Sequence, residues 1–339
     1  MHFDLTDDQK EIRRVARELL AARSSWARVR EAAEAGAAYD EGLWRELCGL
    51  GWPGIAVSEE FGGQGLGAVE LAVLLEELGY ACAATPFLSS AAAAAAIEAC
   101  GSEEQRARWL AALAAGEATA GIGTRALCAD GVGAAVLVLL ERPSGEALLV
   151  SGAECAPLET IDPTRRYATV SGGDAEPLGG RGGAGAVAAA DRVRAAVAAE
   201  VVGVAQRALE MTLAYVKERR QFGVPVGAFQ AVQNRCAQML LDVESARSTA
   251  LFAAWAADAA PERLPEAAAL AAAAAADGGR AVAASAIQAH GGIGFTWEAD
   301  VHWLYKRAQL DAALLGGARR HRAMLASLAA ARVAQATYS

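Results

Sequence analysis

The feature that most constrains this fold is a long run of small and apolar residues, with few polar interruptions, at positions 195–215. The run contains no proline, and it is far longer than an ordinary β-strand. Alanine, the strongest helix former, dominates the composition of the whole chain. The run therefore predicts a buried helix, and its large apolar residues are Val197, Val201, Val204, Leu209, Met211 and Leu213.

A second helix is predicted after a short basic loop. Its apolar residues recur at spacings of mostly three and four, which places them on one helical face. They are Phe229, Val232, Cys236, Met239, Leu240, Val243 and Ala246. Between the two patterns, Gly223, Pro225 and Gly227 break helical structure. We therefore expect two long helices that pack antiparallel across this loop.

The loop carries residue types that bind phosphate and aromatic groups. Arg219 and Arg220 supply guanidinium groups, Phe222 supplies an aromatic ring, and the glycines leave backbone amides accessible. An ordinary polar turn between helices is the simpler interpretation of this segment taken alone.

A second motif, IQAHGGIGFTWE at residues 287–298, contains another helix end. Gly291 and Gly292 predict the end of one helix, as C-terminal caps require. A new helix is expected after Thr296, with Glu298 in its first turn.

Three regions are predicted along the chain. Residues 1–118 form an all-helical N-terminal domain, residues 119–189 a small β domain and residues 190–339 a helical domain. In the middle region, apolar runs at 134–140 and 147–150 flank Pro143, Ser144 and Gly145, which predicts a hairpin. Further helices are expected at 265–290, at 297–309 and from 317 onward. The fold class is therefore mainly α with a small β domain.

Bulk properties exclude several classes of function. The net charge of −9 provides no basic surplus for nucleic acid or an anionic membrane surface. No segment is apolar and long enough to span a membrane. The scattered cysteines form no CxxC pair, and residues 1–20 are charged, which favours the reducing cytoplasm. His290 and His302 have no partners at metal-ligand spacing, so no metal site is expected.

The two motifs together resemble the acyl-CoA dehydrogenase family. The resemblance lies in RRQFG at 219–223, GAFQAVQ at 227–233, QAHGGIGFTWE at 288–298 and a run from Leu43 to Gly116. It implies a helical N-terminal domain, a middle β domain and a C-terminal four-helix-type bundle. It also implies FAD and the α,β-dehydrogenation of an acyl-CoA in lipid metabolism, for which a carboxylate removes the α proton.

The same resemblance indicates that this chain lacks the catalytic base. The two positions at which the family carries its glutamate match Val193 and Gly316 here, and neither side chain transfers protons. The family's flavin-contacting threonine and glutamine match Ala318 and Arg320. Glu200 is a weak candidate base, but a buried glutamate more often pairs with an arginine at a helix–helix or subunit contact.

The flavin-ring half of the family's site is also missing from the middle domain. Residues 121–126 replace the family's TEPxxGS-type loop, and no tryptophan lies between Trp109 and Trp255. The other half is complete: the positions that contact the ADP end of FAD in the family are all matched. They are Arg219, Phe222, Gln230, Gln288, Gly291 and Gly292.

These matches favour one hypothesis and leave two alternatives open. The hypothesis is the non-catalytic, beta-type subunit of an actinobacterial α2β2 enzyme that shortens steroid side chains. Such a subunit shares FAD with a homologous catalytic subunit, which binds the acyl-CoA substrate and passes electrons to an acceptor. One alternative is a self-sufficient homo-oligomeric acyl-CoA dehydrogenase that uses Glu200 or another unrecognised base. The other is a flavin-free acyl-CoA-binding or scaffold protein.

Overall fold

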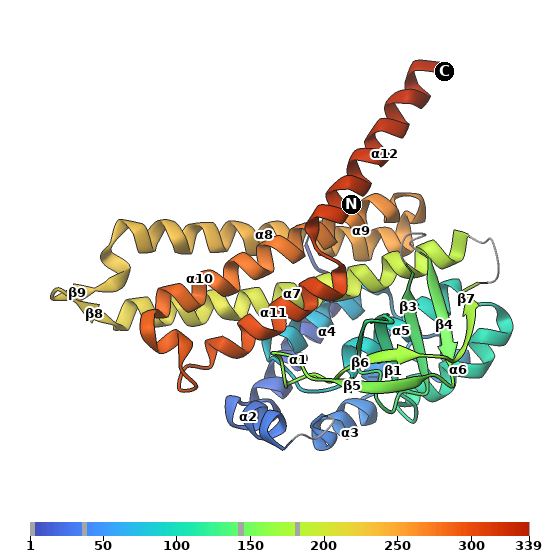
Figure 1. The fold of residues 1–339 in the computed structure, drawn as a ribbon, viewed down its shortest axis with the longest axis horizontal. Helices are drawn as coiled ribbons and strands as arrows, with labels where there is room; N and C mark the ends of the chain where they lie inside the picture. Colours follow the sequence, from blue (N-terminus) through green and yellow to red (C-terminus); the bar gives the residue numbers. More distant parts are fainter. Residues whose placement is uncertain (1–3, 36–38, 142–145, 180–183, 339) are drawn as a thin grey trace.

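The longest helix of the structure, α7 (Ala184–Glu218), lies at the centre of the molecule (Figure 1). In the computed structural model, residues 4–35, 39–141, 146–179 and 184–338 are described. Helix α7 contains the whole predicted run at 195–215 and begins about three turns before it. It contacts helices of both the N-terminal and the C-terminal regions, so it joins the parts of the molecule.

The N-terminal region is helical, as predicted. It consists of α1 (Asp7–Arg23), α2 (Trp26–Glu34), α3 (Glu41–Gly49), α4 (Ala68–Tyr80), α5 (Phe87–Cys100) and α6 (Glu103–Ala115). Helices α4 and α7 cross closely because each helix places a glycine against the backbone of the other. A Cβ at Gly203 would lie 1.8 Å from the Glu76 carbonyl oxygen, and one at Gly79 would lie 2.1 Å from that of Glu200. Side chains at these positions would push the two helices apart.

The middle region is a curled seven-stranded sheet in the order β5-β6-β2-β1-β3-β4-β7. The predicted hairpin is confirmed: β3 and β4 pair antiparallel, with Leu140 opposite Ala147. Its predicted turn, Pro143 to Gly145, lies outside the described residues. The strands are β1 (Ala120–Thr124), β2 (Leu127–Ala129), β3 (Val136–Leu140), β4 (Ala147–Ser151), β5 (Glu154–Leu158), β6 (Tyr167–Ser171) and β7 (Asp174–Pro177).

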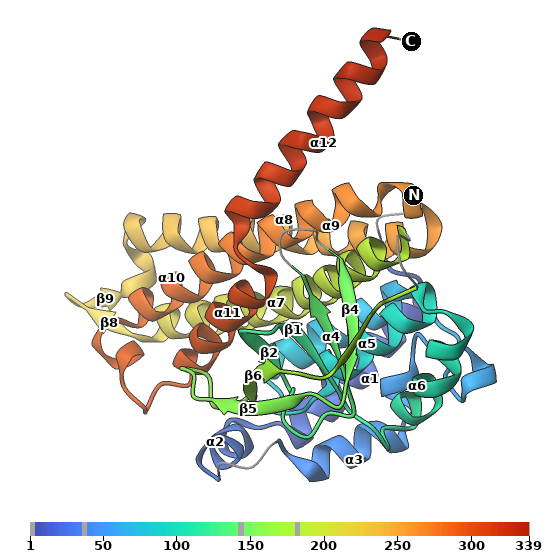
Figure 2. The ribbon, with the colours of Figure 1, turned by 45° about the vertical axis from the view of Figure 1, so that its right-hand side comes forward.

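The C-terminal region is a helical bundle around α7 (Figures 1 and 2). Helix α8 runs antiparallel to α7, and the short strands β8 and β9 form a hairpin between them. The predicted helix at 265–290 is nearly continuous, interrupted only by a π-helical turn at Ala275–Gly279. The elements are β8 (Arg220–Gln221), β9 (Val224–Pro225), α8 (Gln230–Ala259), α9 (Leu264–Ala274), α10 (Arg280–His290), α11 (Val301–Leu315) and α12 (Ala318–Tyr338).

Two predicted details of this bundle are wrong. Helix α11 begins at Val301, not just after Thr296, so Glu298 lies in a turn outside the helix. The Thr296 hydroxyl donates to the Ile293 carbonyl at 2.8 Å, which closes a 3₁₀ turn instead of starting a helix. Leu240 was expected on the buried face of α8, but its side chain is 51% exposed. Helix α8 lies at the edge of the bundle, with α7 and α10 on one side of it (Figure 1).

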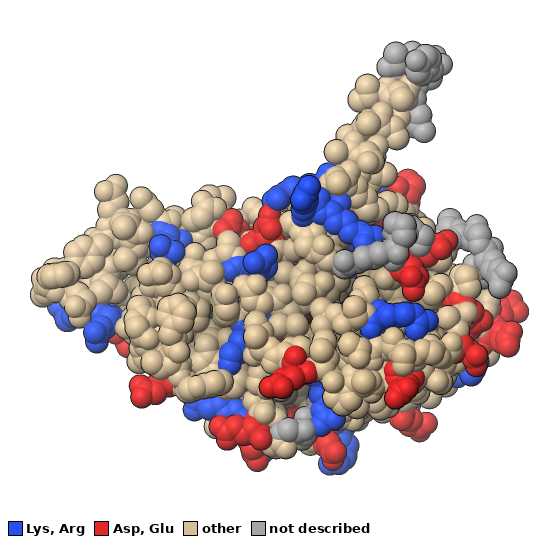
Figure 3. All heavy atoms as spheres, viewed as in Figure 1, with Lys and Arg blue, Asp and Glu red and all other residues tan. Residues whose placement is uncertain are grey.

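The surface carries both acidic and basic side chains. Basic and acidic side chains are interspersed on the face shown in Figure 3. On that face, uncharged side chains cover most of the end that carries the hairpin β8–β9, and basic side chains lie along its lower edge. Within the described ranges, no helix is both long and apolar enough to cross a membrane.

Candidate nucleotide half-site

The hairpin between α7 and α8 places an aromatic ring in solvent at its tip. Gln221 pairs with Val224, so Phe222 and Gly223 form a two-residue turn, and both have positive φ, 52° and 82°. This combination matches the type I′ turn that suits β-hairpins. Glycine adopts it freely, but an L-residue with a bulky side chain pays about 1–2 kcal/mol. Phe222 is nevertheless there, with 93% of its surface exposed.

A cleft of about 850 Å³ opens between this hairpin, the start of α8 and the end of α10. Five of the six residues singled out from the sequence line it: Arg219, Phe222, Gln288, Gly291 and Gly292. They come from segments about 70 residues apart in the chain, which the antiparallel bundle brings together. Gln230 is exposed at the first position of α8 and does not line the cleft.

The end of α10 forms an open backbone wall of the cleft. Helix α10 ends at His290, and Gly291 follows with φ 66° and ψ −144°, a conformation that favours glycine. A Cβ at Gly291 or Gly292 would meet no atom within 4 Å. The space above both residues is therefore free, and a ligand can approach the bare backbone closely.

Sequence reasoning missed two charged residues of this cleft, Arg235 and Glu298. Arg235 lies one helical turn beyond Ala231, which also lines the cleft, so the spacing along α8 was a usable signal. Its Nη1 is 3.5 Å from the Ser285 hydroxyl, and it forms no ion pair with a described carboxylate. Arg219 and Arg235 thus offer two guanidinium groups to an anion, and Glu298 offers a carboxylate to donor groups.

The wall behind the cleft is held by His290 and Tyr215. Their rings stack with centroids 4.4 Å apart, and His290 Nδ1 lies 2.7 Å from the Ala286 carbonyl oxygen. Burial lowers the pKa of His290, so the ring is neutral near pH 7. Among the described residues, no three His, Cys, Asp or Glu side chains gather in a way that could hold a metal ion.

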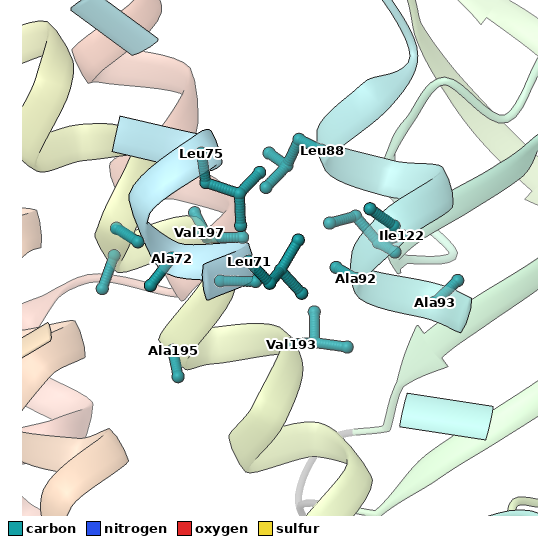
Figure 4. Close-up of a cluster of buried hydrophobic side chains, with 14 of the residues drawn as sticks. Leu71, Ala72, Leu75, Leu88, Ala92, Ala93, Ile122, Val193, Ala195 and Val197 are labelled. Atoms are coloured by element: carbon teal, nitrogen blue, oxygen red, sulfur yellow. The ribbon is translucent and has the colours of Figure 1, made fainter. Parts of the chain in front are cut away.

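The two positions that match the family's catalytic glutamate carry no acid. Val193 is buried among Leu71, Leu88, Ala92 and Ile122, in the closed apolar core of Figure 4. The small gap beside this core, between α4, α5, α7 and α8, has a volume of only about 20 Å³. That volume suits about one water molecule and no acyl chain. Gly316 caps the end of α11 in a left-handed conformation with φ 81°.

Glu200 is part of a buried ion network, so the predicted pairing with an arginine is present. Its Oε1 accepts from Arg165 Nη2 at 2.5 Å and from Arg307 Nη1 at 3.3 Å. Burial alone would raise the pKa of Glu200, but its attraction to Arg165 and Arg307 prevails and lowers it. A carboxylate held ionised by two arginines is a weak proton acceptor, and Glu200 therefore does not resemble a catalytic base.

The middle domain also lacks a loop that could hold a flavin ring at the matched position. Strands β1 and β2 pair directly, with Thr124 opposite Leu127, so only Arg125 and Ala126 lie between them. The Leu127 amide donates to the Thr124 hydroxyl at 3.2 Å and tightens this turn. Residues 121–126 are therefore used within the sheet.

Comparison with known proteins identifies the family. Residues 6–117 match the acyl-CoA dehydrogenase N-terminal domain, and residues 180–330 match the acyl-CoA dehydrogenase C-terminal domain. The acyl-CoA dehydrogenase IpdE2 of Mycobacterium tuberculosis is 35% identical over 92% of this chain and 94% of its own length. This chain belongs to the acyl-CoA dehydrogenase family. The resemblance predicted from the sequence motifs is confirmed.

Solved acyl-CoA dehydrogenase structures extend the similarity to proteins crystallised as complexes. A variant of the Tcur3481-Tcur3483 steroid ACAD contains a chain 31% identical to this one, with a TM-score of 0.86. The alignment covers 97% of this chain and 99% of that one. The ChsE4-ChsE5 complex from Mycobacterium tuberculosis contains a chain 27% identical, with a TM-score of 0.85 over 97% and 99% of the two chains.

Proposed function

We propose that this chain is a non-catalytic subunit of a flavin-dependent acyl-CoA dehydrogenase, and that it lends the ADP half of the FAD site to a homologous catalytic subunit. The observation that carries the proposal is a contrast within this chain between the residues of the nucleotide cleft and the positions of the catalytic base. The nucleotide cleft combines Arg219, Phe222, Gln288, Gly291 and Gly292, whereas both base positions lack an acid. Sharing one site between two different chains requires at least an αβ pair, and we propose that two such pairs form an α2β2 assembly.

The residues of the cleft fit the ADP end of FAD. Arg219 and Arg235 neutralise the diphosphate, and Gly291 and Gly292 let the backbone approach it. The exposed ring of Phe222 offers a flat apolar surface to the adenine. When bound, FAD supplies the acceptor for the hydride that leaves the β carbon of the acyl-CoA.

The partner subunit supplies the chemistry that this chain lacks. It provides the carboxylate that removes the α proton, the pocket for the acyl group and the contact with an electron-transfer acceptor. The similarity to a steroid ACAD supports an acyl-CoA derived from a steroid side chain as the substrate class. The 20 Å³ gap in the core supports acyl binding by the partner and not by this chain.

The two alternatives have less support. A self-sufficient dehydrogenase needs a base, but Glu200 is bound to Arg165 and Arg307 and shielded from solvent. A flavin-free scaffold gives no reason for an open cleft in which two guanidinium groups lie beside bare backbone.

Replacing Arg219 with alanine tests the proposal. We expect Arg219→Ala to lower the flavin content of the complex with a catalytic homologue at least several-fold, because one of two diphosphate contacts is lost. Arg220→Ala is the matched control, since Arg220 does not line the cleft and its Nη1 donates to the Gly223 carbonyl. Flavin content is measured by absorbance of the purified complex. Equal flavin content in the two variants would contradict the assignment of Arg219.

A further inference from the structure

A second cleft, which we call the aromatic cleft, lies on the other side of the 3₁₀ turn η6 (Gly291–Phe295). It has a volume of about 430 Å³ and lies between Ile161 of the middle domain, α10, and the turn that leads into α11. Phe295 is 81% exposed and Trp297 is 71% exposed at its rim. Large aromatic side chains contribute strongly to burial energy, so two adjacent exposed ones indicate a surface that another molecule covers.

The aromatic cleft also contains two polar side chains, Lys306 and His302, that have neither a hydrogen bond nor an ion pair with a described residue. The Lys306 ammonium lies 4.0 Å from the ring centroid of Trp297 and 4.6 Å from that of Trp303, and forms no ion pair with a described carboxylate. His302, only 8% exposed, lines the cleft, and neither of its ring nitrogens has a hydrogen-bond partner among the described residues. A carboxylate would complement the ammonium, and an apolar side chain would cover the rings.

The aromatic cleft is adjacent to the nucleotide cleft. Thr296 lines both, and the turn η6 forms the wall between them. In the proposed complex, one FAD molecule extends from the nucleotide cleft into the partner subunit. The distance between that subunit and the turn η6 therefore cannot exceed the length of one FAD molecule. Its surface would then also meet Phe295 and Trp297, which are exposed beside the shared wall.

We infer that the aromatic cleft receives a segment of the catalytic partner subunit that carries an apolar side chain and a carboxylate. The inference rests on the proposed function and adds to it the surface through which the partner is recognised. The apolar side chain packs on Phe295 and Trp297, and the carboxylate pairs with Lys306.

The test is the dissociation constant of the complex with a catalytic homologue from the same genome, measured with saturating FAD. We expect the double variant Phe295→Ser/Trp297→Ser to raise the dissociation constant at least about tenfold, as loss of a central aromatic contact does. Lys306→Gln is expected to raise it several-fold and to weaken its salt dependence. Leu50→Ser is the matched control, because Leu50 is an exposed apolar residue of the N-terminal region, and it should leave the dissociation constant unchanged.

The outcomes separate this inference from the proposed function. Phe295 and Trp297 are exposed, so the double variant should keep the circular dichroism spectrum of the wild type, while loss of the Trp297 contacts with His302, Trp303 and Lys306 lowers its melting temperature only slightly. A double variant that binds the catalytic subunit as tightly as wild type, with the same flavin content, would overturn the docking inference alone. The same result would follow if the cleft served a small molecule. A wild-type chain that forms no flavin-containing complex would contradict the proposed function, and the docking inference with it.

Discussion

At the scale of single residues, Phe222 is a residue type that the conformation of its turn disfavours. Asparagine followed by glycine is the preferred pair for a two-residue hairpin turn with positive φ at both positions. Here phenylalanine precedes Gly223 with φ 52°; its side chain is 93% exposed, and its ring meets that of Phe229 edge-on with centroids 6.2 Å apart. Strain of this kind persists where a ligand or partner requires the side chain, and we attribute it to the adenine contact.

This account predicts opposite effects of one substitution on stability and on binding. Phe222→Asn removes the strain, and so should stabilise the isolated chain by about 1 kcal/mol, because little buried surface is lost. The same change should reduce flavin retention by the complex several-fold. Thermal unfolding of the chain and absorbance of the complex measure the two effects. A variant with wild-type flavin content would show that the ring at 222 is not needed.

Some residues of the site were predictable and others were not, for physical reasons. Arg219, Gln288 and Gly291 stand in compact motifs, so local sequence was sufficient to select them. Arg235 and Glu298 acquire their role only when α8 and the turn after η6 meet at one cleft, which is a tertiary event. The ion pair between Arg165 and Asp311 joins residues 146 positions apart, and no local pattern predicts it.

At the scale of elements, the helices and sheet were predictable because burial leaves a periodic pattern. The long run at 195–215 and the hairpin of β3 and β4 show this. The start of α11 was missed because a side-chain hydrogen bond from Thr296 closed a turn where a helix cap was expected. The apolar stripe of α8 was expected to be buried, but Val232 and Cys236 are only half-buried and Leu240 is exposed. A face that a partner covers has the same pattern as a face that the chain itself covers.

A buried carboxyl group, that of Asp130, should make the stability of the protein depend on pH. It lies where β6, α5, α7 and α11 meet. Asp130 is buried there, and burial raises its pKa from 3.8 to about 6, although Arg165 and a hydrogen bond from Ser89 lower it. The unfolded chain releases this proton near pH 4, whereas the folded chain keeps it until about pH 6. Stability from this group is therefore lost as the pH rises from about 4 to 6.

Asp130→Asn should remove the loss of stability that occurs as the pH rises from about 4 to 6. Asparagine keeps the shape of the side chain and tolerates the φ of 54° at this position. We expect the variant to exceed the wild type in free energy of unfolding by about 2–3 kcal/mol above pH 6, and to match it below pH 4. Denaturant titrations at several pH values measure the difference. A constant difference at all pH values would mean that Asp130 does not titrate in this range.

At the scale of the whole molecule, the fold is that of an acyl-CoA dehydrogenase. The cleft at the end of α7 is open, whereas the core around Val193 is filled. Helix α12 projects from the bundle in Figures 1 and 2, and the hairpin extends from another end of the molecule. The molecule therefore presents the residues of this cleft outward, as the proposed sharing with another subunit requires.

The most direct test of the central claim is the visible absorption spectrum of the purified chain, recorded alone and after co-expression with a catalytic homologue from the same genome. The account predicts a colourless chain alone and a yellow complex with about one flavin for each pair of subunits. A stoichiometric flavin spectrum from the chain alone would contradict the half-site proposal, because one chain would then hold both halves.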